Sequence, residues 1–248
     1  MMNKKFNQFS YDEYFEILKK YREKITNLNT FNSANSFTIL RHDVEFSTQK
    51  AYRMSLLESN NKIKSNYFFQ VISDAYNISS ITNRNLLNKI HEMGHTIGLH
   101  LYISHIKVGD WSAFKSELNF QREVIEKIIS KPINCFSIHR PPSWVLENRD
   151  DEINGLINLY GNSYFEFSPK PANIKYLADS MHRWNYGHPL EECDYKKIQI
   201  NIHPDHWSDE GYSEFENFQL LIEENKNEFI KVLDSETITF SNYSKKTF

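Results

Sequence analysis

The sequence predicts an α/β fold built around a mostly parallel sheet or barrel. Short apolar or β-branched segments alternate with amphipathic segments of helical periodicity, which is the pattern of βα units. Polar residues gather directly after the strand candidates, and in parallel α/β proteins these strand ends meet at one face. The periodicity does not decide whether the sheet closes into a barrel.

The apolar spacing predicts helices at residues 10–28, 48–60, 82–93, 111–129 and 214–234. In the first of these, Ser10 can cap the helix and Glu13 stands three residues later, as in a capping box. The expected strands are Phe37–Leu40 continuing into residues 41–46, Tyr67–Ile72, Thr96–Tyr102, Asn134–His139, Tyr164–Phe167, Ile174–Ala178 and Ile198–Ile202.

One domain is expected over residues 1–248, with a helical extension over about residues 1–30, because no repeat or Gly/Ser/Pro linker divides the chain. A net charge of −3 argues against a nucleic-acid partner, which calls for a basic surplus. No apolar segment approaches the ~18 residues of a transmembrane helix. The first residues are charged where a signal peptide is apolar, so a cytoplasmic protein is expected.

The segment LRHDVEF carries two carboxylates near a strand end. Asp43 and Glu45 are two residues apart and share one face of a strand, with His42 on the other face. Two carboxylates on one face suit a divalent metal, a proton transfer, or both. Solvated charges on an edge strand are the alternative.

Three histidines follow at five-residue steps: His95, His100 and His105. Two histidines beside a carboxylate leave a fourth zinc position open for water, which is the catalytic arrangement. His100 ends an apolar strand and is the better ligand candidate. His95 follows a helix and a glycine, which favours a turn, and His105 lies in the loop beyond the strand.

Three further polar residues follow strand candidates. Arg140 precedes two prolines and can form a bidentate bridge to a carboxylate, or tie loops together. Asp179 can orient a histidine or arginine, or cap the next turn. His203 on a stiff strand end suits a general acid, although a core histidine bonded to a carbonyl is equally open.

Four aromatic residues lie near these clusters, and aromatic rings are the usual platform for the apolar faces of sugars. They are Tyr102, Trp144, Trp184 and Trp207, and each can instead belong to the core.

Taken in order, five segments resemble the motifs of the polysaccharide deacetylase family, also called the NodB-homology domain. The resemblance spans about residues 37–207. The variant pattern of these segments resembles the branch of deacetylase-like proteins of surface-polysaccharide biosynthesis. It implies a distorted, incomplete (β/α) barrel with a bound divalent metal, commonly zinc. It also implies hydrolysis of an N-acyl group on an amino sugar. The segments are RHDVE at 41–45, GHTIGLHLYISH at 94–105, HRPPSW at 139–144, ADS at 178–180 and INIH at 200–203.

The resemblance also implies roles for single residues. Asp43 and His100 match metal ligands, and His203 matches the general acid. Arg140 matches the residue that holds the catalytic base, and Asp179 matches the carboxylate of the fourth motif.

The sequence departs from the family pattern at three places. His42 stands where the family has its base Asp, so His42 and Glu45 are rival bases, or Glu45 is a further ligand. Four residues separate His100 from His105, where the family has three, and His105 is kept as a possible ligand. The third motif has Ser143 and Trp144 at its end, so the substrate wall differs.

The expected activity is metal-dependent removal of an N-acyl group, in the first instance acetyl, from an amino sugar of polysaccharide biosynthesis. A nucleotide-linked or lipid-linked intermediate of capsule or O-antigen assembly fits a cytoplasmic enzyme. Two other readings stay open: a non-catalytic sugar-binding or scaffold protein on the same fold, and an amidohydrolase for a non-sugar amide.

Overall fold

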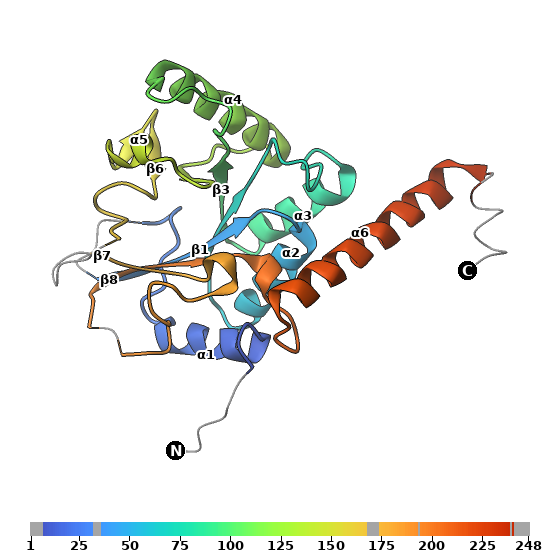
Figure 1. The fold of residues 1–248 in the computed structure, drawn as a ribbon, viewed down its shortest axis with the longest axis horizontal. Helices are drawn as coiled ribbons and strands as arrows, with labels where there is room; N and C mark the ends of the chain where they lie inside the picture. The colour runs from blue at the N-terminus through green and yellow to red at the C-terminus, as the bar shows by residue number, and fades with distance from the viewer. Residues whose placement is uncertain (1–6, 32–35, 168–173, 193, 239, 241–248) are drawn as a thin grey trace.

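The computed structural model describes residues 7–31, 36–167, 174–192, 194–238 and 240, and its core is an open, curved sheet surrounded by helices (Figure 1). The strands are β1 (Phe37–Val44), β2 (Asn66–Phe69), β3 (Thr96–Leu101), β4 (Cys135–Ile138), β5 (Glu152–Ile153), β6 (Leu156–Asn158), β7 (Ile174–Ala178) and β8 (Lys197–Ile202). The helices are α1 (Tyr11–Tyr21), α2 (Thr48–Asn60), α3 (Ile81–Glu92), α4 (Trp111–Ile129), α5 (Ser143–Leu146) and α6 (Glu214–Glu236), with 3₁₀ turns η1 (Ser180–His182) and η2 (Pro204–His206).

The eight strands follow the order β5-β6-β4-β3-β2-β1-β8-β7. All neighbouring strands run parallel except β5 and β6. The edge strands β5 and β7 do not pair with each other, so the sheet stays open. This confirms the predicted α/β class and the incomplete barrel.

The predicted helices at 48–60, 82–93, 111–129 and 214–234 are confirmed to within two residues, but the first ends at Tyr21 rather than at 28. After α1 the chain leaves the helix to bridge β1: Ile25 pairs with Thr38, and the Thr38 amide donates to the Lys24 carbonyl. The short segment therefore covers the start of β1.

The strand predicted at Tyr164–Phe167 is wrong. The segment is irregular, and Phe165 instead buries its ring against Tyr160 and Tyr176, each at 4.8 Å between centroids. A short hairpin, β5–β6, precedes it. Its turn is Asn154-Gly155, where both residues have positive φ, 52° and 76°, as a two-residue type I′ turn requires.

The central strand β1 is buried at all eight positions and presents different chemistry on its two faces. Arg41 and Asp43 point to the interior of the open barrel, whereas His42 points to α1 and α2. Because side chains alternate along a strand, one set of polar groups of β1 lies at the site and the other set contacts the helix layer.

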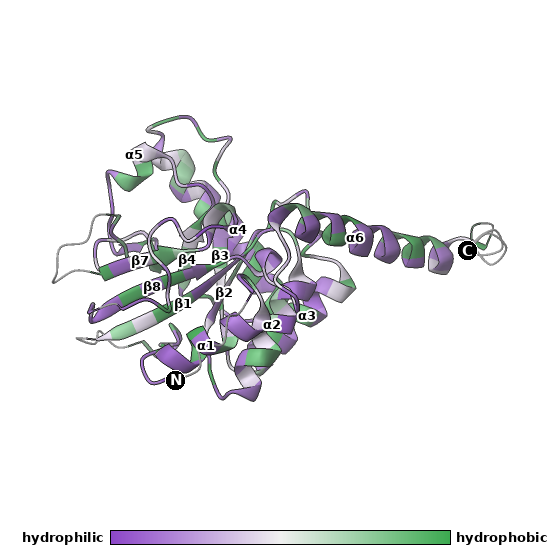
Figure 2. Cartoon of the chain, turned by 60° about the horizontal axis from the view of Figure 1, so that its bottom comes forward, coloured by the Kyte–Doolittle hydropathy of each residue, from purple (hydrophilic) through white to green (hydrophobic). Residues whose placement is uncertain are grey.

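Helix α6 packs only its first turns on the body and then extends away from it (Figure 2). Asn217 donates from its amide to the His206 carbonyl, and Leu221 is buried. Among the described helices, none is long and apolar enough to span a bilayer.

Candidate metal centre and active site

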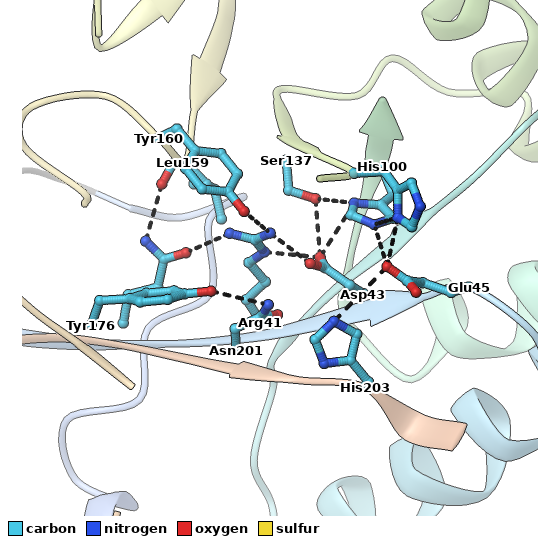
Figure 3. A network of polar contacts seen from close by, with 12 residues as sticks. Arg41, Asp43, Glu45, His100, Ser137, Leu159, Tyr160, Tyr176, Asn201 and His203 are labelled. Carbon is cyan, nitrogen blue, oxygen red and sulfur yellow. Dashed lines mark hydrogen bonds and ion pairs between the residues drawn. The ribbon is translucent and has the colours of Figure 1, made fainter. Parts of the chain in front are cut away.

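Polar side chains from the carboxyl ends of β1, β3, β4 and β8 converge in the interior of the open barrel (Figure 3). The β1–β8 and β3–β4 registers place these ends side by side, because parallel neighbours start and stop together. The sequence prediction that strand ends carry the chemistry is therefore matched by the geometry.

Glu45, His100 and His139 form the tightest cluster. Glu45 Oε1 lies 3.1 Å from His100 Nε2 and 2.7 Å from His139 Nδ1, and the two ring nitrogens are 3.3 Å apart. The other nitrogen of His100, Nδ1, is 2.8 Å from the Ser137 hydroxyl, which fixes the ring with Nε2 toward Glu45. The Tyr102 ring stacks on His139 at 5.3 Å.

This donor set fits a divalent cation. Donor atoms bound to one tetrahedral zinc at about 2.0–2.2 Å lie about 3.4 Å apart, close to the separations in the cluster. Burial lowers the pKa of His100, so its ring is neutral and offers a lone pair. Burial opposes ionisation of Glu45, but its hydrogen bonds with His100 and His139 lower the pKa of Glu45 well below the usual value. Two imidazoles and one carboxylate are ligands that zinc accepts in catalytic sites.

Asp43 lies beside this cluster and is held by Arg41 from the same strand. Arg41 Nε donates to Asp43 Oδ1 at 2.8 Å, and Nη2 donates to Oδ2 at 2.5 Å. The guanidinium also donates to Gln199 Oε1 at 2.9 Å and to the Tyr160 hydroxyl at 3.0 Å. Burial alone would raise the pKa of Asp43, but the Arg41 charge lowers it to about 2.

The opposite side of the site holds an Asp–His pair. His203 Nδ1 lies 2.6 Å from Asp179 Oδ1, and the His203 amide donates to the same carboxylate. Trp207 Nε1 donates to Asp179 Oδ2 at 2.8 Å. Burial would lower the pKa of His203, but the Asp179 charge raises it to about 9. The other ring nitrogen, Nε2, lies 3.9 Å from Glu45 Oε1, so it faces the Glu45–His100–His139 cluster.

Asp179, His203 and His206 also lie close enough to share an ion. Both Asp179 oxygens, however, already accept N–H donors from His203 and Trp207. The donor set therefore fits an oriented imidazolium better than a second cation.

A cavity of about 560 Å³ opens onto these groups, with Asp43, Glu45, His100 and His203 on its wall. Aromatic rings form another part of its lining. The rings there are Tyr160, Phe165, Phe167, Tyr176 and Tyr186.

Three of the predicted catalytic or ligand residues lie elsewhere or have other partners. His42 is buried on the far face of β1, where Nε2 lies 3.0 Å from Glu58. His105 is exposed and lies 3.4 Å from Glu117, because the loop after β3 turns away from the cluster. Arg140 lines the cavity but forms no ion pair among the described residues, and Arg41 holds Asp43 in its place.

The four predicted substrate-binding aromatics do not line the cavity. Tyr102 backs His139, and Trp144 packs edge-on against Trp111 at 5.0 Å. Trp184 packs in the layer beneath α1, and Trp207 is fully buried and holds Asp179. The contacts of these four residues therefore match the alternative stated for them, a place in the core or in support of the site, and not a place at the substrate.

Among the charged and candidate ligand residues of the site, Arg41 and His139 had no assigned role in the sequence prediction. The period of two along a strand places Arg41 on the face of Asp43 and Glu45, which is a usable signal. His139 follows β4, the neighbour of β3, and this adjacency is visible only once the strand order is known.

No family model matches the chain, and no curated protein matches it. Solved structures do show similarity. The chitin deacetylase from Colletotrichum lindemuthianum is 17% identical over 41% of this chain and 44% of its own, with a TM-score of 0.34. The chain thus spans less than half the length of that protein.

Two proteins of Bacillus anthracis align over more of the chain. A family 4 carbohydrate esterase is 17% identical over 84% of this chain and 81% of its own, with a TM-score of 0.41. A family 4 pseudoenzyme is 13% identical over 77% of this chain and 60% of its own, with a TM-score of 0.46. The activities in these names are those of the matched proteins.

Proposed function

We propose that this protein is a metal-dependent hydrolase that removes an N-acyl group, in the first instance acetyl, from an amino sugar. The observation that carries the proposal is the placement of three functional units around one cavity. They are the Glu45–His100–His139 cluster, the Asp43–Arg41 pair and the His203–Asp179 pair.

Glu45, His100 and His139 would hold the cation, and zinc suits this donor set best. When bound, such a cation supplies a Lewis acid that activates water and polarises an acyl oxygen. The Ser137 hydroxyl and the Tyr102 ring keep the two imidazoles in place. Supporting contacts of this kind orient ligands in metal sites.

Asp43 is the carboxylate placed to take the proton that the attacking water loses. It lines the cavity, and Arg41 keeps it ionised at neutral pH. This assignment takes the alternative in which Glu45 is a ligand, and it makes Asp43, expected from the sequence to be a ligand, the base. His42, on the other face of β1, has no path to the reacting atoms.

His203 is the group placed to protonate the leaving amine. With a pKa of about 9 it is an imidazolium at neutral pH, and its Nε2 faces the cavity. Asp179 keeps the other nitrogen engaged, so the proton available for donation is the one on Nε2.

The cavity lining supports a sugar as the carrier of the acyl group, because it includes the aromatic rings of Phe167 and Tyr186, and aromatic rings bind the apolar faces of sugars. A nucleotide-linked or lipid-linked amino sugar of polysaccharide biosynthesis, processed in the cytoplasm, is the substrate expected from the sequence and is part of this proposal.

The test is metal analysis by plasma mass spectrometry together with acetate release from N-acetylglucosamine and its UDP-linked form. The wild type should carry about one divalent ion per chain. His139→Ala and Glu45→Gln should lose it, and His105→Ala is the matched control that keeps it. Asp43→Asn should keep the metal and lose turnover.

Loss of metal in Asp43→Asn but not in Glu45→Gln would restore the ligand roles expected from the sequence. Stoichiometric metal in His139→Ala would refute the cluster. Metal and sugar binding without acetate release from any N-acetylated sugar would favour the sugar-binding alternative.

A further inference from the structure

Arg140 stands on the wall of the cavity and is exposed. Among the described residues it forms no ion pair and no side-chain hydrogen bond. Every other lining residue with a charge in the reaction centre has a partner: Asp43 has Arg41, Glu45 has two histidines, and His203 has Asp179.

Arg140 is also the only lysine or arginine among the described residues that line the cavity. One more acidic side chain, Glu214, lines it from the first turn of α6, where it complements the helix dipole. No ion pair joins Glu214 to Arg140. The cavity therefore presents one cation that no acidic group of the described chain neutralises.

The backbone around Arg140 is constrained in a way that holds this side chain at the cavity. Arg140 has φ of 46°, a left-handed conformation that residues with a Cβ adopt at an energetic cost. His139, a candidate ligand, precedes it, and its amide donates to the Leu101 carbonyl. Pro141 and Pro142 follow and have no N–H to offer an anion. The guanidinium is the donor that this loop supplies.

We propose that the substrate carries an anionic group, a phosphate or a carboxylate, near its acylated amine, and that Arg140 binds this group. The proposal rests on the proposed function and specifies its substrate class. A guanidinium presents two parallel N–H donors that match the oxygens of either anion. Arg140 is then a specificity residue: it binds a neighbouring group of the substrate and not the bond that is cleaved.

The experiment is isothermal titration calorimetry of the metal-loaded protein with three probes that share one acetamido group. N-acetylglucosamine is neutral, N-acetylglucosamine 1-phosphate carries a phosphate, and N-acetylmuramic acid carries a carboxylate. The variants are Arg140→Gln, Arg140→Lys, and Arg183→Gln as the control, because Arg183 is exposed and does not line the cavity. Metal content is measured for each.

The wild type should bind one anionic probe at least about 10-fold more tightly than the neutral sugar, the size of one charge-assisted interaction. Arg140→Gln should lose that preference and keep its affinity for the neutral sugar. Arg140→Lys should retain part of it, and Arg183→Gln all of it. Which anionic probe gains distinguishes a phosphate from a carboxylate.

Equal affinities for neutral and anionic probes in the wild type would overturn the proposal. An anion preference that survives in Arg140→Gln would also overturn it, because the anion would then bind the metal rather than Arg140. Acetate release is measured on the same samples. If no acetate is released but the preference for an anionic probe still depends on Arg140, the result would count against the proposed hydrolase and not against the anion site.

Discussion

The buried pair of Arg41 and Asp43 gives the sharpest test of how this site is built. Both side chains are almost completely excluded from solvent, and two hydrogen bonds of 2.8 and 2.5 Å join them. Arg41→Met removes the charge and keeps much of the side-chain volume. Asp43 is then left as a buried carboxylate without its counter-charge.

The magnitude follows from two independent routes. Breaking a buried ion pair by removing one partner costs about 3–5 kcal/mol of unfolding free energy. The pKa of Asp43 falls from 3.8 to about 2 in the folded state, which corresponds to about 2–3 kcal/mol at neutral pH. Since the folded pKa is depressed, this stability is present above pH 3.8 and is lost as the pH falls toward 2.

The assay is urea unfolding of the metal-free protein at pH 7, followed by far-UV circular dichroism. Arg41→Met, Asp43→Asn and the double variant form a thermodynamic cycle. Each single variant should be destabilised, and the double variant should be destabilised by at least about 1 kcal/mol less than their sum. In Arg41→Met the pKa of Asp43 should rise above 3.8, because burial then acts without the guanidinium. Acidification from pH 7 to 4 should therefore stabilise this variant relative to the wild type.

Additive single-variant effects, within about 0.5 kcal/mol, would refute the reasoning. So would an unchanged pH dependence in Arg41→Met. Either result would mean that Asp43 is held ionised by something other than Arg41.

Three further predictions concern His203, Glu58 and Gly98. In metal-free protein, NMR titration should give His203 a midpoint near 9, and Asp179→Asn should move it to 6.5 or below; an unmoved midpoint would exclude Asp179 as the cause. Glu58 is buried with a pKa lowered to about 2, so its stabilisation is present above pH 4.5 and lost as the pH falls through 2. Glu58→Gln should then cost about 3 kcal/mol at pH 7 and less at pH 3 in urea unfolding, and a pH-independent cost would contradict this. Gly98→Ala should cost about 1–3 kcal/mol by the same measurement, because a Cβ there would lie 2.5 Å from the Phe68 ring; unchanged stability would show that Phe68 can move aside.

The strands and helices could be predicted where their signals are local. The helices at 48–60 and 111–129 were placed to the residue, because their apolar spacing and caps lie within a few residues. The strand expected at Tyr164–Phe167 failed for the converse reason. A short aromatic segment reads as a strand, but Phe165 finds its contacts with rings distant in sequence.

The sequence by itself determined which residues stand at the carboxyl ends of the strands and on which face, because the apolar segments and the alternation of side chains along them are local properties of the chain. This is why Asp43, His100 and His203 line one cavity, as their positions in the chain predicted, with Asp179 bound to His203 behind its wall. It also determined the α/β class, through the regular alternation of strand and helix segments, whereas the strand pairing of the tertiary structure shows that the sheet stays open.

Only the tertiary structure decided the partners. His105 is closer in sequence to His100 than His139 is, yet the loop after β3 carries His105 to Glu117 while β4 brings His139 to Glu45. Two arginines could have held Asp43, and Arg41 does so while Arg140 stays unpaired at the cavity. Spacing along a strand places a side chain on a face, but beyond the strand end its direction depends on the loop backbone and on which strands are neighbours.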